Sequence, residues 1–224
     1  MAVLDDTGRA LIAAAVRAAE AQTSGEIVPV LADRSDGYTD VALLWAVAAA
    51  FTAMSVFAAV PEPFLDAWDW AFGGWSHDWS TGEIASLVIG LGLIKFIAVM
   101  LVQQWEPLQF SLIPGPTKTI RVRNQAVRQF RVGAARRTTG RTGVMIYLSM
   151  REHRAEIVAD ESIAAMVPAE VWGEAMADML SHIRQGRIAE GLAAGIKDVG
   201  FVLAEHFPRS ENDVNELPDR LIEV

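Results

Sequence analysis

The sequence predicts an α/β fold of the α+β kind, in which helices flank a small mixed sheet and a two-helix transmembrane hairpin interrupts the soluble domain. Two observations support this fold class. Two long stretches in the first half of the chain are almost free of charge, and the segments around them show the apolar patterns of helices and strands. The 224 residues suffice for one ordinary domain and a small membrane segment. There is no cysteine, which excludes disulfides, thiolate metal sites and cysteine nucleophiles.

Residues 1–40 predict one helix followed by one strand. Thr7 precedes an apolar stripe at helical spacing and is the expected N-cap of the helix. Residues 26–31, with the sequence EIVPVL, predict the strand. Pro29 cannot donate a ladder hydrogen bond, so we expect a free edge or a bulge there. One helix and one strand cannot form a domain alone, so their partners must follow the hairpin.

Residues 41–104 predict the transmembrane hairpin. Residues 41–60 contain no charged side chain, and 20 helical residues span roughly 30 Å, the thickness of a bilayer core. Residues 84–102 form the second span and are interrupted only by Lys95. A lysine near the centre of a span costs about 2.5–3.5 kcal/mol, but each of the twelve Leu, Ile, Val and Phe residues contributes roughly −0.3 to −0.6 kcal/mol. The second span can therefore carry Lys95, whereas the alternative for both segments is a buried core helix.

Small residues predict how the two spans pack against each other. They are Ala46, Ala49, Ala50 and Ala53 in the first span and Gly90 and Gly92 in the second. Residues 61–83 connect the spans and contain no Lys or Arg. This segment carries four tryptophans, Trp68, Trp70, Trp75 and Trp79. We expect an interfacial loop at the level of the lipid headgroups, because tryptophan is enriched there.

The distribution of basic residues predicts the membrane topology. Residues 104–142 carry eight Lys or Arg and a single acid, whereas the loop between the spans carries no Lys or Arg. By the positive-inside rule we expect a multi-pass protein of the cell (inner) membrane, with both termini cytoplasmic and the loop extracytoplasmic. The residues expected to contact anionic lipid or a partner protein are Lys118, Arg121, Arg123, Arg128 and Arg131. A phosphate-bearing ligand is the alternative, and no nucleic acid is expected because no known binding module accompanies the charge.

Residues 105–208 predict the remainder of the soluble domain. The predicted elements are an extended segment at 108–113, a helix at 121–137, paired strands at 143–148 and 153–159, and helices at 172–183 and 188–203. Residues 209–224 are mostly polar, and we expect a disordered tail.

Four short motifs recur in the order of one known family. They are TSGEI at 23–27, GVMIYLS at 143–149, REHR at 151–154 followed by Ile157 and Val158, and IRQG at 183–186. In this order they resemble the TPM domain family, often called TPM phosphatases. The resemblance covers nearly all of the soluble sequence. The usual member has an uninterrupted domain, commonly outside the cytoplasm, so the inserted hairpin is a departure.

The resemblance implies divalent-cation binding and weak phosphatase activity, through an Asp before the Gly-led strand and an Asp pair in the turn that follows it. Here Arg141 and Thr142 stand at the first place, and residues 151–154 keep one acid at the second. A hard cation takes several carboxylate oxygens, so we expect at most a weak Ca²⁺ or Mg²⁺ site and no firmly bound cofactor. Its candidate ligands are Glu152, Asp160 and Glu161.

The depleted acids and the hairpin together predict a role other than catalysis. We expect a membrane-anchored TPM-like protein that serves as an accessory, assembly or quality-control factor for another membrane protein at the cytoplasmic face. No catalytic residue can be named from the sequence. The alternative is a divalent-cation-dependent phosphate-ester hydrolase of the TPM type, which rests on the resemblance alone.

Overall fold

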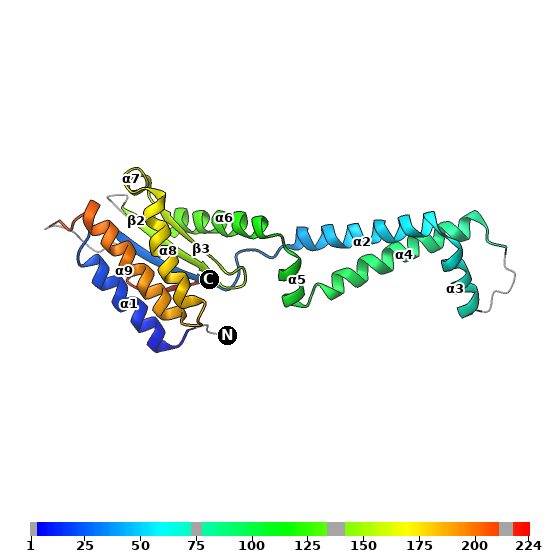
Figure 1. Ribbon diagram of the computed structural model, residues 1–224, viewed down its shortest axis with the longest axis horizontal. Helices are drawn as coiled ribbons and strands as arrows, with labels where there is room; N and C mark the ends of the chain where they lie inside the picture. The colour runs from blue at the N-terminus through cyan, green and yellow to red at the C-terminus, as the bar shows by residue number, and fades with distance from the viewer. Residues whose placement is uncertain (1–3, 73–77, 134–141, 211–216) are drawn as a thin grey trace. The chain divides into compact units, whose positions relative to one another are not determined.

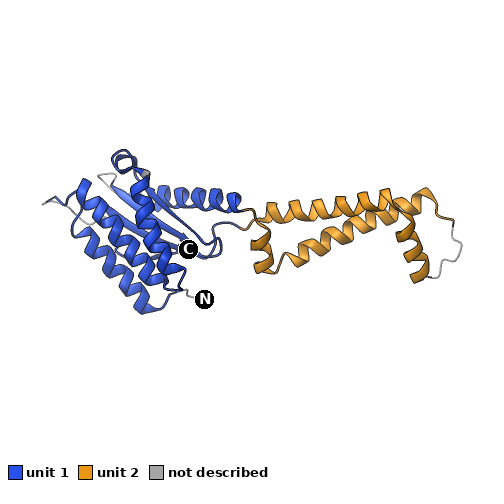
Figure 2. Ribbon diagram, viewed as in Figure 1, with its two compact units in different colours: residues 1–36, 115–224 blue, residues 37–114 orange. Residues whose placement is uncertain are grey.

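The computed structural model describes residues 4–72, 78–133, 142–210 and 217–224 (Figure 1). The chain divides into two compact units (Figure 2). Unit 1 combines Met1–Asp36 with Gly115–Val224, and unit 2 is Gly37–Pro114. The predicted mixed α/β fold class is confirmed. Trp75 and Arg141, to which the sequence assigned roles, lie outside the described residues.

A mixed four-stranded sheet forms the centre of unit 1. The strands are β1 (Glu26–Ala32), β2 (Gly143–Ser149), β3 (Arg154–Ala159) and β4 (Ile222–Glu223). Their order is β3-β2-β1-β4. β1 pairs in parallel with β2 and β4, whereas β2 and β3 are antiparallel, as their short connection requires.

The prediction of a disordered tail is wrong for its last residues. β4 pairs with β1 at Val30 and Leu31. Leu217, which precedes β4, is only 6% exposed and belongs to the core. The tail is polar on average, but its few apolar residues find a sheet edge that a local pattern cannot reveal.

Pro29 lies within β1, and its missing N–H faces the edge of β1 on which β4 lies. The carbonyl of Leu31 accepts a hydrogen bond from the N–H of Val224, so Leu31 faces β4. Backbone groups two residues apart on a strand face the same neighbour, and Pro29 therefore also faces that side. The pairing with β4 begins only at Val30. The free edge that we predicted at Pro29 is confirmed.

Helices cover both faces of the sheet (Figure 1). The helices of unit 1 are α1 (Asp6–Glu20), α6 (Gly115–Gly133), α7 (Glu161–Ala164), α8 (Ala169–Ile183) and α9 (Ile188–His206). α1, α8 and α9 pack with Ile27, Leu31, Ile146 and Leu148 on one face. α6 covers the other face through Val122, Ala126 and Phe130. Side chains alternate along β1 and β2, and because both faces are covered every residue of these strands is buried.

Two helix starts differ from the sequence-based prediction. The N-cap of α1 is Asp5 rather than Thr7, because the Asp5 carboxylate accepts the N–H of Gly8 at 2.7 Å. α6 begins at Gly115 rather than at residue 121. Pro116 suits the first turn of a helix, where a missing N–H costs no hydrogen bond.

The described secondary structure of unit 2 consists of helices joined by short connections. Its helices are α2 (Thr39–Ala59), α3 (Glu62–Phe72), α4 (Thr81–Val102) and α5 (Glu106–Leu112). α5 replaces the extended segment predicted at 108–113, because Pro107 favours a helix start and its apolar residues were too few to show a helical period. α3 lies within residues 61–83, where we predicted only a loop.

α2 and α4 pack side by side as a hairpin. As predicted, small residues line the contact, since Ala46 and Ala50 of α2 and Gly92 of α4 are buried. A Cβ on Gly92 would lie 2.6 Å from the Met54 sulfur, so the helices approach closely there. The prediction for Gly90 is wrong, because a Cβ at Gly90 would meet nothing within 4 Å. Residues two apart on a helix point in different directions, so Gly90 and Gly92 cannot share one face.

Both helices of the hairpin are long and apolar enough to cross a membrane. α2 has 21 residues and α4 has 22, and of their most apolar windows only 22% and 6% are buried within the protein. Large apolar side chains such as Phe51 (64% exposed) and Ile94 (66% exposed) point away from the helix contact.

Candidate functional site

The carboxyl ends of β1 and β2 form the edge at which an open α/β sheet usually builds its site. Residues 33–36 follow β1, and residues 150–153 follow β2 at the same edge. The first turns of α6 lie there as well, because Arg121 pairs with Asp36 and Thr119 accepts a hydrogen bond from Arg154. Polar side chains from these three segments meet at this edge.

Four buried polar residues form a hydrogen-bonded chain, which we call the Ser–Glu cluster: Ser35, Tyr147, Ser149 and Glu152. The hydroxyl of Ser149 donates to Glu152 Oε2 at 2.5 Å, and the hydroxyl of Ser35 donates to Ser149 Oγ at 2.8 Å. Because the single proton of Ser35 Oγ is used in this way, Tyr147 must donate to Ser35 across the remaining 3.1 Å contact. All donors are thus directed towards one carboxylate.

The other carboxylate oxygen of Glu152 is also engaged. Glu152 Oε1 accepts the backbone N–H of Ser35 at 2.9 Å. The residue is 2% exposed, and burial raises the pKa of Tyr147 beside it. Glu152 therefore ties the turn after β2 to the end of β1, and its oxygens are occupied by donors of the protein itself.

Arginines and aspartates line the rim of the same edge. Arg151 Nε lies 3.2 Å from Asp33 Oδ1, and Arg121 Nη1 of α6 lies 2.6 Å from Asp36 Oδ2. The Arg121–Asp36 pair is half-buried, whereas Arg151 and Asp33 are more exposed. The positive charge near the Ser–Glu cluster is thus largely balanced by acids at the end of β1.

The structure does not bring the three predicted metal ligands together. Glu152 lies before β3, and Asp160 and Glu161 follow it. A six-residue strand spans roughly 15–20 Å, too far for one ion. Asp160 instead accepts the N–H of Gly143 at 3.0 Å, and Glu161 is exposed in the first turn of α7. Within the described ranges no group of three or more Asp, Glu, His or Cys side chains could hold a metal.

The predicted basic residues lie on α6, off its buried face. Arg123, Arg128 and Arg131 are exposed, while Lys118 and Arg121 are half-buried near the start of the helix. Arg123 lies 3.9 Å from Glu156, and Arg128 donates to Gln125. α6 therefore turns an apolar side to the sheet and an arginine-rich side to its surroundings.

Sequence reasoning missed Ser35, Asp33 and Asp36 as members of this edge. A usable signal was present, because the polar run DRSD directly follows a strand that is apolar from Ile27 to Ala32. Polar residues at the carboxyl end of a buried parallel strand are expected to face a site.

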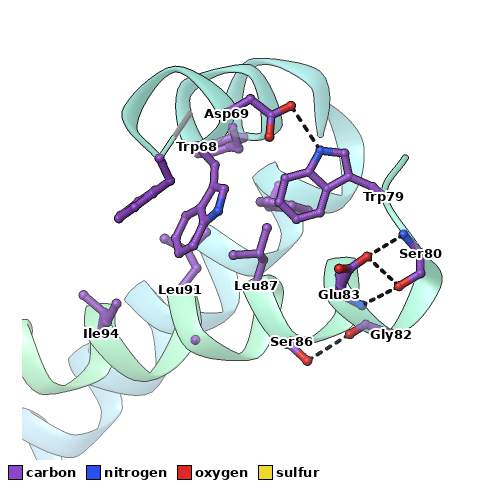
Figure 3. A pocket seen from close by; sticks show the side chains of 14 residues that line it. Trp68, Asp69, Trp79, Ser80, Gly82, Glu83, Ser86, Leu87, Leu91 and Ile94 are labelled. Carbon is purple, nitrogen blue, oxygen red and sulfur yellow. Dashed lines mark hydrogen bonds between the residues drawn. The ribbon is translucent and has the colours of Figure 1, made fainter. Parts of the chain in front are cut away.

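Unit 2 has a second concave feature, an apolar pocket between α3 and α4 (Figure 3). Its volume is about 880 Å³. The walls are mainly aromatic and aliphatic, from Phe57, Phe64, Trp68, Phe72, Leu87 and Leu91. At one side Trp79 Nε1 donates to Asp69 Oδ2 at 3.4 Å, and Ser80 and Glu83 form the capping box that starts α4.

Comparison with known proteins supports the resemblance drawn from the sequence. Residues 112–201, from the end of α5 into α9, match the TPM domain. The fold is similar to the NMR structure of the BA42 protein from the psychrophilic bacterium Bizionia argentinensis sp. nov., at 18% sequence identity and a TM-score of 0.56. That similarity covers 99% of this chain and 95% of the other. No curated protein matches the sequence.

Proposed function

We propose that this chain, whose residues 112–201 match the TPM domain, is a membrane-anchored accessory or quality-control factor that acts on another membrane protein at the cytoplasmic face. The burial of Glu152 carries the proposal. It is the one acid in the turn where the family resemblance implies a metal-binding pair, and both of its oxygens accept hydrogen bonds from the protein. A group used in this way holds the fold together and has little capacity left for a cation.

Membrane anchoring is supported by the exposed apolar surface of α2 and α4. Water-exposed apolar patches of this extent are rare on soluble proteins, whereas hydrocarbon accommodates them without cost. Lys118 and Arg121 follow the end of α4 within the about 15–20 residues over which basic side chains set topology, and the other arginines of α6 come after them. We assign these residues to the cytoplasmic side, where their charge favours anionic lipid or an acidic partner.

Lys95 supports a partner within the membrane. It is exposed on α4, and it has no ion-pair partner among the described residues. A cation within the bilayer core costs about 2.5–3.5 kcal/mol, which a carboxylate on a neighbouring helix would offset. The alternative is that its side chain extends to the nearer headgroup layer.

Affinity purification of the full chain from solubilised membranes tests the proposal. We expect one membrane protein to be recovered reproducibly, and to be lost when Arg128 and Arg131 are both changed to Glu. Arg184→Glu, on the exposed surface of α8's end, is the matched control and should recover the same protein. Failure to recover any reproducible partner would contradict the proposal.

A phosphatase assay separates the two hypotheses. The purified full chain is incubated with p-nitrophenyl phosphate and Ca²⁺, Mg²⁺ or Mn²⁺, and the Glu152→Gln variant is measured in parallel. We expect no metal-dependent hydrolysis above that of the variant. Hydrolysis that requires the metal and disappears in Glu152→Gln would establish the hydrolase instead.

A further inference from the structure

The pocket of unit 2 has the character of a lipid site. Phe64, Trp68 and Phe72 of α3 line it together with Leu87 and Leu91 of α4. Figure 3 shows Trp68 directed towards α4. Its volume of about 880 Å³ falls within the range of roughly 300–1,000 Å³ that is typical of small-molecule sites. Apolar walls of this size select a hydrocarbon chain rather than a polar ligand.

Gly90 leaves space at the base of this pocket. It lines the pocket, and a Cβ placed on it would meet nothing within 4 Å. The neighbouring Gly92 differs, because it is buried against Met54 in the contact with α2. Gly90 thus serves no helix contact within the described part of the hairpin and instead keeps the pocket open.

The polar side of the pocket is acidic. Asp69 Oδ2 accepts from Trp79, while Asp69 Oδ1 has no hydrogen-bond partner among the described residues. Glu83 lies nearby in the capping box of α4. From residue 41 to residue 94 the sequence contains no Lys or Arg, so no such side chain there balances the charge of Asp69 and Glu83. An anionic headgroup is repelled here, whereas an ammonium group is attracted by the carboxylates and by the faces of Trp68 and Trp79.

We propose that this pocket binds one acyl chain of a zwitterionic phospholipid and that Asp69 and Trp79 select its ammonium headgroup. The inference rests on the proposed membrane anchoring of α2 and α4. It adds a specific lipid ligand, which neither the family match nor the fold assigns.

The full chain, reconstituted into vesicles of equal parts phosphatidylethanolamine, phosphatidylcholine and phosphatidylglycerol, tests the inference. After mild solubilisation, the lipids retained by the protein are identified by native mass spectrometry. We expect each of the two zwitterionic lipids to exceed phosphatidylglycerol by about fivefold or more, in line with the strength of a desolvated cation–aromatic contact. Equal retention of all three lipids would show only unselective contact and would overturn the proposal.

Two variants and one control locate the retained lipid. Gly90→Leu fills the open space while favouring the helix, and it should abolish retention. Ala98→Leu adds similar bulk on α4 outside the pocket and should leave retention unchanged. Asp69→Asn keeps an acceptor for Trp79 but removes the charge, so lipid should be retained without the headgroup preference. Unchanged retention in Gly90→Leu would contradict the pocket assignment.

Flotation of the same vesicles separates this inference from the proposed function. If the wild-type chain does not float with the vesicles, membrane anchoring itself fails. If it floats and yet retains no selected lipid, only the pocket inference fails. A photocrosslinker attached to the cysteine of the Gly90→Cys variant identifies the occupant of the pocket. A crosslink to lipid supports the inference, whereas a crosslink to another protein shows that a partner helix fills the pocket and contradicts it.

Discussion

Unit 1 and unit 2 contain apolar segments of similar strength but place them in opposite ways. In unit 1 every residue of β1 and β2 is buried, since helices cover both faces of the sheet. In unit 2 the apolar side chains of α2 and α4, such as Phe51 and Ile94, point away from the helix contact. Burial of apolar surface from water stabilises unit 1 by about 25 cal/mol per Å². The same surface in unit 2 gains this free energy only from hydrocarbon around it.

The polar groups show the reverse contrast. Unit 1 buries Ser35, Tyr147, Ser149 and Glu152 and satisfies them internally. Unit 2 leaves Lys95 exposed and one oxygen of Asp69 without a partner among the described residues. In unit 1 the protein itself supplies donors to both oxygens of the Glu152 carboxylate, whereas Lys95 and Asp69 Oδ1 in unit 2 have no such partner among the described residues.

Phe51→Arg is expected to have the largest effect on unit 2. Phe51 lies near the centre of α2, and arginine there should disfavour membrane insertion by about 3–4 kcal/mol. In water, the same exchange on an exposed surface would be nearly neutral. Insertion is measured by glycosylation mapping of the full chain. Val132→Arg, at an exposed site of α6 in unit 1, is the control and should not affect insertion. If the glycosylation pattern were the same for Phe51→Arg and the wild type, the position of residue 51 would not be in hydrocarbon.

Gly200→Val tests the packed interior of unit 1. A Cβ at Gly200 would lie 2.6 Å from Ala19 Cβ and 3.2 Å from Ala19 Cα, so α1 and α9 would have to separate. Overpacking of this kind costs about 1–3 kcal/mol. Two measurements in detergent, urea unfolding and hydrogen exchange in β1 and β2, should each show this loss of stability. Gly173→Ala, where nothing lies within 4 Å, should instead gain about 0.5–1 kcal/mol. Equal stability of the two variants would refute the close approach.

Elements that depend on local pattern were predictable from the sequence. β1, β2, α9 and the two long apolar helices α2 and α4 show continuous or periodic apolar residues, and the structure has each of them within a few residues of the predicted bounds. β3 was predictable because a short turn allows its pairing with β2.

Elements that depend on distant contacts were not predictable. β4 has two residues and exists because β1 offers an edge nearly 200 residues earlier in the chain. The Ser–Glu cluster joins Ser35 to Glu152 across a sequence separation of 117 residues. The sequence predicted Glu152 only as a weak candidate metal ligand, because Ser35, whose N–H donates to one of its oxygens, is distant in the chain.

Glu152→Ala tests how much the buried Glu152 carboxylate contributes to the stability of unit 1, compared with an exposed ion pair. It leaves the Ser35 N–H and the Ser149 hydroxyl buried without their acceptor, which should cost about 1–3 kcal/mol of unit 1 stability. Asp33→Ala removes only an exposed ion pair with Arg151 and should cost no more than about 1 kcal/mol. Urea unfolding of both variants with and without Ca²⁺ measures these costs. A calcium-dependent gain in stability that is lost in Glu152→Ala would mean that the carboxylate holds an ion.

Glu20→Gln gives the effect that depends most on pH, because it is small at acid pH and appears only as the pH rises. Glu20 Oε1 accepts the N–H of Ile27 at 2.8 Å on the edge of β1 that β4 leaves open. Burial raises the pKa of Glu20 from 4.5 to about 8, and nearby Glu26 and Asp219 add to the rise, whereas the hydrogen bond from Ile27 opposes it. The folded chain therefore holds this proton up to about pH 8, whereas the unfolded chain releases it near pH 4.5.

The sign of the pH effect follows from this difference. As pH rises from about 4.5 to about 8, the unfolded state gains by losing the proton, so the free energy of unfolding falls. Glutamine keeps an oxygen acceptor for Ile27 but carries no charge. Urea unfolding should therefore give equal stability for the variant and the wild type at pH 4.5, and greater stability for the variant at pH 9. Glu174→Gln, on the exposed side of α8, should leave the pH dependence unchanged.

Hydrogen exchange locates the loss of stability that the wild type shows at high pH. Because Glu20 joins α1 to β1, exchange should become faster in unit 1 only. Equal acceleration in α2 and α4 would show that the two units do not unfold independently.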